Sequence, residues 1–110
     1  MKIRVPSKKV SERFHLTYEL KGAQKGVDVL TEYYGIQRMK IVVDGRRVGN
    51  GDDACYDKYV AFFTKRGVNK FNVLHEFYHH LICVNRFEMS ENEEERAANR
   101  YAKEILRSLD

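Results

Sequence analysis

The chain has 110 residues, 43% of them hydrophobic and 33% charged, with a net charge of +4. This length fits a single domain over residues 1–110 with one small core, and the composition excludes fibrous and disordered proteins. No apolar stretch reaches the roughly 18 residues of a membrane helix, so we expect no membrane span. The first residues lack the apolar segment of a signal peptide, so we expect a cytoplasmic protein.

The basic residues suggest no special partner, and the two cysteines, Cys55 and Cys83, fit a reduced compartment. The basic residues stand in short pairs that do not alternate with aromatic residues, so a nucleic-acid partner is not expected. Two cysteines are too few for a disulfide framework. Cys83 lies in an apolar stretch and is predicted to belong to the core.

The first half of the chain predicts two strands and a helix. Residues 14–21 alternate apolar and polar side chains, which favours a strand and leaves a helix as the alternative. Residues 27–35 carry apolar side chains at helical spacing, and Gly35 provides a stop. Residues 37–45 read as a strand, followed by a loop over 46–54 that is rich in Gly and Asp.

The second half predicts a strand and two helices. Residues 59–65 are rich in aromatic and β-branched residues, which favour a strand. Asn69 is a suitable N-cap for a helix over 70–84. Ser90 and Glu93 form a capping box that begins a last helix. The apolar stripe of that helix would consist of Ala98, Tyr101, Ala102, Ile105 and Leu109. The fold class is therefore α+β, with a small mixed sheet of about three strands and helices packed on it.

The predicted helix over 70–84 contains the motif H-E-x-x-H, made by His75, Glu76 and His79. Two residues four apart lie about 40° apart around a helix, so both imidazoles can bind one metal ion. Glu76 is offset by about 100° and can take a proton from a water molecule at that metal. Zinc suits such ligands and brings the pKa of a bound water near 7. His80 lies about 140° from His75, so it is interpreted as a surface or hydrogen-bonded histidine.

A third ligand must come from another element. The downstream candidates are Glu88, Glu91, Glu93, Glu94 and Glu95. Three of them stand in the first turn of the last helix, where carboxylates complement the helix dipole without any chemistry. Glu95 lies in the second turn, three residues before Ala98 of the apolar stripe. Zinc on the facing helix would give this glutamate a partner, so Glu95 is the predicted third ligand.

These residues resemble the gluzincin metallopeptidases, which carry H-E-x-x-H on one helix and a glutamate ligand on a following helix. Residues 95–102, E-R-A-A-N-R-Y-A, look like the E-x-x-A-N-x-x-A pattern of that glutamate helix. The resemblance implies that Glu95 is the third ligand and that Asn99 orients His75. The short chain is similar to the minigluzincins, minimal soluble relatives of membrane zinc peptidases. Radiation-response and repressor-cleaving regulators have a similar glutamate helix.

The resemblance implies two further features. Minigluzincins resemble zymogens held latent by a C-terminal segment, which here would include Leu109 and Asp110. Gluzincins generally have a tyrosine or histidine that stabilises the tetrahedral intermediate, and Tyr101 is the candidate beyond Glu95. Tyr101 is also explained as a core aromatic residue, and His15 and Tyr78 are weaker options.

Three hypotheses follow. The first is a zinc endopeptidase that acts on peptide or protein substrates, with the strand 59–65 as the edge that receives an extended peptide. It would be a monomer, or a homodimer that exchanges its last helix. The second is a zinc-containing regulatory module with little proteolysis, favoured by the missing intermediate-stabilising residue. The third is a nucleic-acid binder with a structural zinc, which the presence of Glu76 argues against.

Overall fold

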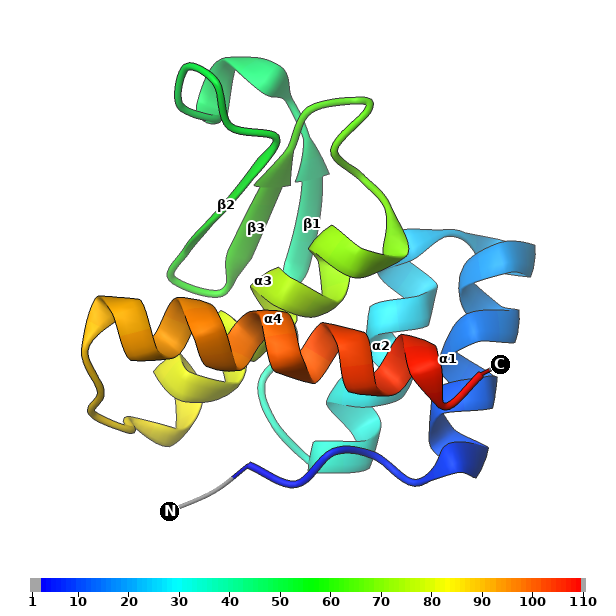
Figure 1. Cartoon of the computed structure of the whole chain (residues 1–110). Helices are drawn as coiled ribbons and strands as arrows, with labels where there is room; N and C mark the ends of the chain where they lie inside the picture. The colour runs from blue at the N-terminus through cyan, green and yellow to red at the C-terminus, as the bar shows by residue number, and fades with distance from the viewer. Residues whose placement is uncertain (1–2, 110) are drawn as a thin grey trace.

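The computed structural model describes residues 3–109 of the chain as an α+β fold with helices on a small sheet (Figure 1). None of the described helices combines the length and the apolar character needed to cross a membrane. The elements in chain order are α1 (Lys8–Lys21), α2 (Ala23–Tyr34), β1 (Lys40–Val43), the 3-10 turn η1 (Gly45–Arg47), β2 (Ala54–Asp57), β3 (Val60–Phe63), α3 (Lys70–Asn85) and α4 (Glu91–Arg107).

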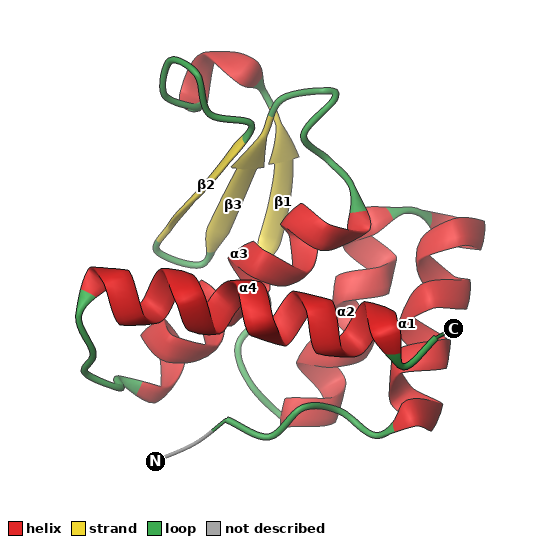
Figure 2. Ribbon diagram, in the orientation of Figure 1, coloured by secondary structure: helices red, strands yellow, loops and turns green. Residues whose placement is uncertain are grey.

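The sheet is mixed and has the order β1-β3-β2 (Figure 2). β3 is the central strand, and it runs parallel to β1 and antiparallel to β2. The predicted class of sheet is confirmed, but two of its features differ from the prediction. The first strand along the chain is β1, which comes later than the strand predicted over 14–21. The strand over 59–65 is not at the edge of the sheet.

Residues 14–21 are helical, so the strand predicted there is wrong. The helix α1 begins after Ser7, whose hydroxyl accepts a hydrogen bond from the Val10 amide. The alternation was misleading because Leu16 and Leu20 are 58% and 79% exposed. Only Phe14 of the alternating residues is fully buried, and the packed side chains recur at helical spacing.

The strand β2 was missed, because the sequence prediction assigned its start to the Gly- and Asp-rich loop. β2 joins β3 through a two-residue turn in which Lys58 and Tyr59 have φ of 42° and 71°. Such turns usually carry Asn or Gly at positive φ. The chain offers neither residue here, so the usual hairpin signal is absent from the sequence.

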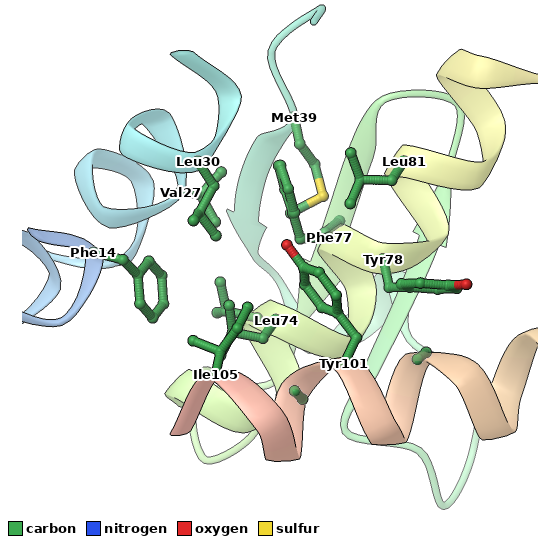
Figure 3. Packing of buried hydrophobic residues seen from close by; sticks show 14 of the residues in the cluster. Phe14, Val27, Leu30, Met39, Leu74, Phe77, Tyr78, Leu81, Tyr101 and Ile105 are labelled. Atoms are coloured by element: carbon green, nitrogen blue, oxygen red, sulfur yellow. The ribbon is translucent and has the colours of Figure 1, made fainter. Parts of the chain in front are cut away.

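The core lies where α3 meets the sheet on one side and α4, α2 and α1 on the other (Figure 3). The expected stripe of α4 is buried from Ala98 to Ile105, and Leu109 is half-buried. Cys83 is exposed, so its assignment to the core is wrong. The core face of α3 runs through Phe77 and Leu81, and Cys83 stands about 200° around the helix from Leu81.

Candidate metal centre

The helix α3 places the two histidines of the motif on one face. Asn69 caps the helix, and its side chain accepts a hydrogen bond from the Asn72 amide. His75 and His79 follow one turn apart, and their Nε2 atoms lie 3.2 Å from each other. The four-residue spacing of the two histidines therefore directs both imidazoles to one position, as predicted from the sequence.

The helix α4 brings a carboxylate to that position. Oε2 of Glu95 lies 3.1 Å from Nε2 of His75, and Oε1 lies 2.9 Å from Nε2 of His79. The three side chains offer ligand atoms that all lie within 4.8 Å of one another. The structure thus brings together the three residues that the sequence predicts as ligands, and they could hold a metal ion.

The other nitrogen of each imidazole has its own partner. Nδ1 of His75 lies 2.9 Å from Oδ1 of Asn99, and Nδ1 of His79 contacts the carboxylate of Glu94. Both partner atoms are acceptors, so each Nδ1 carries the proton and each Nε2 keeps its lone pair. Asn99 thus contacts His75, the residue that the resemblance implies it orients.

Glu94 is a functional candidate that the sequence prediction missed. We expected it only to complement the dipole of α4, as carboxylates in a first helical turn do. It stands four residues before Ala98, which is fully buried, and this spacing puts it on the inward face. That spacing was the available signal, and it applies to Glu94 at least as well as to Glu95.

The centre contains acceptors and no donor. The two Nε2 lone pairs and the Glu95 carboxylate converge, and the Nδ1 protons point away from them. Burial, and secondarily the neighbouring His79, lower the pKa of His75, so His75 does not readily bind a second proton at neutral pH. A cation between the three atoms would relieve their repulsion. Two imidazole nitrogens and one carboxylate oxygen are a donor set that zinc accepts.

Glu76 lies beside this centre without joining it. Its side chain is 9% exposed, and its Oε2 is 4.0 Å from Nε2 of His75. Burial raises the pKa of Glu76 to about 7, and the negative charges of Glu95 and Asp52 add to the rise, while His79 opposes it. Among the described residues the Glu76 carboxylate has no hydrogen-bond partner. It is therefore placed to exchange a proton near neutral pH.

The centre opens into a cavity of about 720 Å³ between β2, α3 and the start of α4. Ala54, Cys55 and Tyr56 of β2 form one wall of it. The strand β3 is paired on both sides, so it cannot receive a peptide as the sequence prediction proposed. The free edge at the cavity belongs to β2 instead.

His80 supports β2 from inside the fold. It is fully buried, and its Nε2 lies 2.6 Å from the carbonyl oxygen of Gln37. Nε2 must donate to that oxygen, so Nδ1 accepts from the Tyr56 hydroxyl at 2.7 Å. The Tyr56 hydroxyl also accepts from the Tyr59 amide at 2.9 Å. The hydrogen-bonded interpretation of His80 is confirmed, and the surface alternative is wrong.

Comparisons with protein-family models, curated proteins and solved structures returned no match to this chain. The resemblance to gluzincins therefore stays a prediction that rests on the residues quoted for it. The structural observation beside it is that His75, His79 and Glu95 are grouped so that they could hold a metal ion.

The structure does not bring Tyr101 to the metal centre. The residue is 3% exposed, its ring packs against Tyr78, and its hydroxyl lies 2.9 Å from the Tyr34 hydroxyl. Tyr34 donates its one proton to the carbonyl oxygen of Arg4 at 2.6 Å, so Tyr101 must be the donor to Tyr34. Tyr101 lines a separate hollow of about 900 Å³ on another side of α4.

The other sequence candidates that the structure describes also lie outside the cavity. Tyr78 lines the same separate hollow as Tyr101, and His15 stands on α1. Leu109 follows the far end of α4, and Asp110 lies outside the described residues. Within one chain, a rise of about 1.5 Å per residue puts Ser108 roughly 20 Å along the helix from Glu95.

Proposed function

We propose that the protein is a zinc-dependent endopeptidase that uses His75, His79 and Glu95 as metal ligands. The observation that carries the proposal is the convergence of three acceptor atoms, with each Nδ1 proton held away by Asn99 or Glu94. Bound zinc would polarise the substrate carbonyl and lower the pKa of a water molecule at the same place.

Glu76 would carry the proton transfers. Its carboxylate faces the cavity beside His75 and has a pKa of about 7, so it can accept a proton from the attacking water. The same group can then pass that proton to the nitrogen of the leaving amine. A structural metal site needs no such carboxylate, which is why Glu76 favours hydrolysis over a purely structural role.

The edge of β2 would align the substrate. One side of β2 pairs with β3, and the other side belongs to no strand among residues 3–109. An extended peptide can add to such an edge through main-chain hydrogen bonds. The cavity that contains the metal ligands lies along this strand, so a peptide held there would pass the proposed zinc position.

The test compares the full-length protein with its Glu76→Gln variant on an unfolded protein such as casein. We expect one zinc per chain in both, hydrolysis by the wild type, and none by the variant, because an amide cannot take the proton of water at neutral pH. Hydrolysis by the variant at the wild-type rate would show that another protease or another mechanism is at work.

A regulatory, partner-binding module with little proteolysis is the alternative, and one observation favours it. Tyr56 is the one hydroxyl-bearing side chain among the described residues that line the cavity, and it donates its proton to His80. No side-chain hydroxyl of this described lining is then free to stabilise a tetrahedral intermediate. Zinc binding with no detectable hydrolysis, in full-length and truncated protein alike, would favour this alternative.

A further inference from the structure

The cavity at the metal centre is acidic although the whole chain is basic. Its described lining contains five carboxylates and two imidazoles, but no Lys or Arg, whereas the chain has a net charge of +4. Glu94 and Glu95 are engaged by the histidines, and Glu76 is buried beside them. The two carboxylates that remain at the exposed mouth belong to Asp52 and Glu91.

The carboxylate of Asp52 has no partner in the described chain, whereas the carboxylate of its neighbour Asp53 has two. Asp53 accepts hydrogen bonds from the side chains of Thr64 at 3.3 Å and Arg66 at 3.1 Å. Its carbonyl lies so close to Gly67 that a Cβ there would approach to 2.1 Å, so this part of the loop is fixed against the end of β3. The carboxylate of Asp52 has no ion pair or hydrogen bond within residues 3–109 and lines the cavity.

The same contrast occurs at the start of α4. Glu93 belongs to the capping box with Ser90, whose hydroxyl lies 3.1 Å from its carboxylate, and it faces the separate hollow. Glu91 lines the metal cavity, and its carboxylate pairs with no cation in the described part of the chain. Two unpaired carboxylates therefore line the cavity from two different elements, one from the loop before β2 and one from α4.

A zinc ion would not neutralise this lining. Its two positive charges would offset the negative charge of Glu95 and that of one further carboxylate, either Glu94 or Glu76. These carboxylates lie closest to the histidines. Glu76 is more than nine-tenths buried and points into the cavity with no hydrogen-bond partner in the described chain. The field at the mouth therefore remains negative, and a cationic group on a substrate would meet it favourably.

We propose that the cavity selects peptides that carry a Lys or Arg side chain beside the scissile bond, with Asp52 and Glu91 as the residues that receive it. This inference rests on the peptidase function proposed above, and it names the class of substrate for that site. A peptide with a Glu side chain at the same place would be repelled. The preference weakens as salt rises, because both carboxylates are exposed.

Binding and cleavage are measured separately on the full-length, zinc-loaded protein. Labelled extended peptides carry Lys, Gln or Glu in turn at each position that flanks a central peptide bond. Fluorescence anisotropy with Glu76→Gln protein measures affinity without turnover, and the wild type measures cleavage of the same set. Asp52→Asn and Glu91→Gln are made in both backgrounds, with Glu93→Gln as the matched control because it changes the same helical turn of α4.

At one flanking position we expect the Lys peptide to bind about three- to tenfold more tightly than the Gln peptide at low salt, and the Glu peptide to bind most weakly. Asp52→Asn and Glu91→Gln should each reduce this preference by about two- to fivefold, and Glu93→Gln should keep it. Equal affinities for the three peptides, or an equal loss in Glu93→Gln, would overturn the inference.

The two proposals fail in different ways. If the wild type cleaves all three peptides equally, the peptidase function stands and the selectivity is refuted. If the Lys peptide binds selectively and zinc is present, but no peptide is cleaved, the recognition by Asp52 and Glu91 stands and the peptidase function is refuted.

Discussion

Glu94 on α4 accepts a hydrogen bond from Nδ1 of His79 on α3. This contact directs the lone pair of Nε2 towards Glu95, which lies 2.9 Å away. Asn99 does the same for His75 on the neighbouring turn of α4. One helix therefore supplies both a proposed ligand and the two groups that orient the proposed histidine ligands, so the candidate metal centre depends directly on the packing of α3 against α4.

Metal removal should destabilise the protein. Without a cation the two Nε2 lone pairs and the Glu95 carboxylate face one another, so a chelator at neutral pH should lower the melting temperature, and zinc should restore it. His75→Ala and His79→Ala should each lose most of the zinc affinity. Calorimetry and metal analysis check this, and a metal-free protein with an unchanged melting curve would contradict it.

Glu94 and Glu95 should differ in the size of their effects. Glu94→Gln should weaken zinc binding by about 10- to 100-fold, because it disturbs the orientation of His79. Glu95→Ala removes a ligand and should cost more. Competition with a chromogenic chelator measures both, with Glu93→Gln as the control. A larger loss in Glu94→Gln than in Glu95→Ala would show that Glu94 is the ligand.

The stability of the metal-free protein should depend on Glu76. Its pKa is raised from 4.5 to about 7 in the fold, so the unfolded chain loses the proton first as pH rises. The stabilising effect of the protonated group is complete below pH 4.5 and is lost as pH rises towards 7.

As pH rises from 4.5 to about 7, the free energy of unfolding of Glu76→Gln should therefore increase by roughly 3 kcal/mol relative to that of the wild type. Urea unfolding in the presence of a chelator at a series of pH values measures the difference. The lowered pKa of His75 changes stability in the opposite direction, but it is present in both proteins and cancels in the comparison. A constant difference across the pH range would refute the assignment.

Tyr101→Phe should affect stability and leave zinc binding unchanged. The substitution removes the donor to Tyr34, and Tyr34 keeps its bond to Arg4, so the free energy of unfolding should fall by about 1 kcal/mol. Thermal unfolding and zinc titration test this. If hydrolysis were also lost with zinc still bound, Tyr101 would have the role in stabilising the intermediate that the resemblance implies.

If the C-terminal segment holds the protein inactive, it should do so by covering the cavity of a second copy of the chain. Ser108 lies roughly 20 Å along α4 from Glu95, so the end of α4 is far from the cavity of its own chain. Truncation after Arg107 should raise activity only in samples that contain dimers, and dilution to monomer should raise it equally. Size-exclusion chromatography with parallel assays measures this. Activation of a strictly monomeric sample by truncation would contradict exchange between copies.

The sequence by itself determined the candidate ligands and the two helices that carry them. The caps Asn69 and Ser90 and the four-residue spacing of His75 and His79 act within single helices, so local rules were sufficient. The apolar stripe of α4 likewise predicts which side of that helix faces the core, and four of its five residues are fully or nearly fully buried.

Only the tertiary structure decided what those helices meet. The alternation in residues 14–21 by itself fits a strand. In the fold these residues are helical, and α2 and α4 cover one side of the helix and leave Leu16 exposed. The position of β3 between β1 and β2 depends on pairing between distant residues, which no local pattern encodes. The roles of Glu94 with His79 and of Tyr56 with His80 arise in the same way, because each hydrogen bond joins elements that only packing brings together.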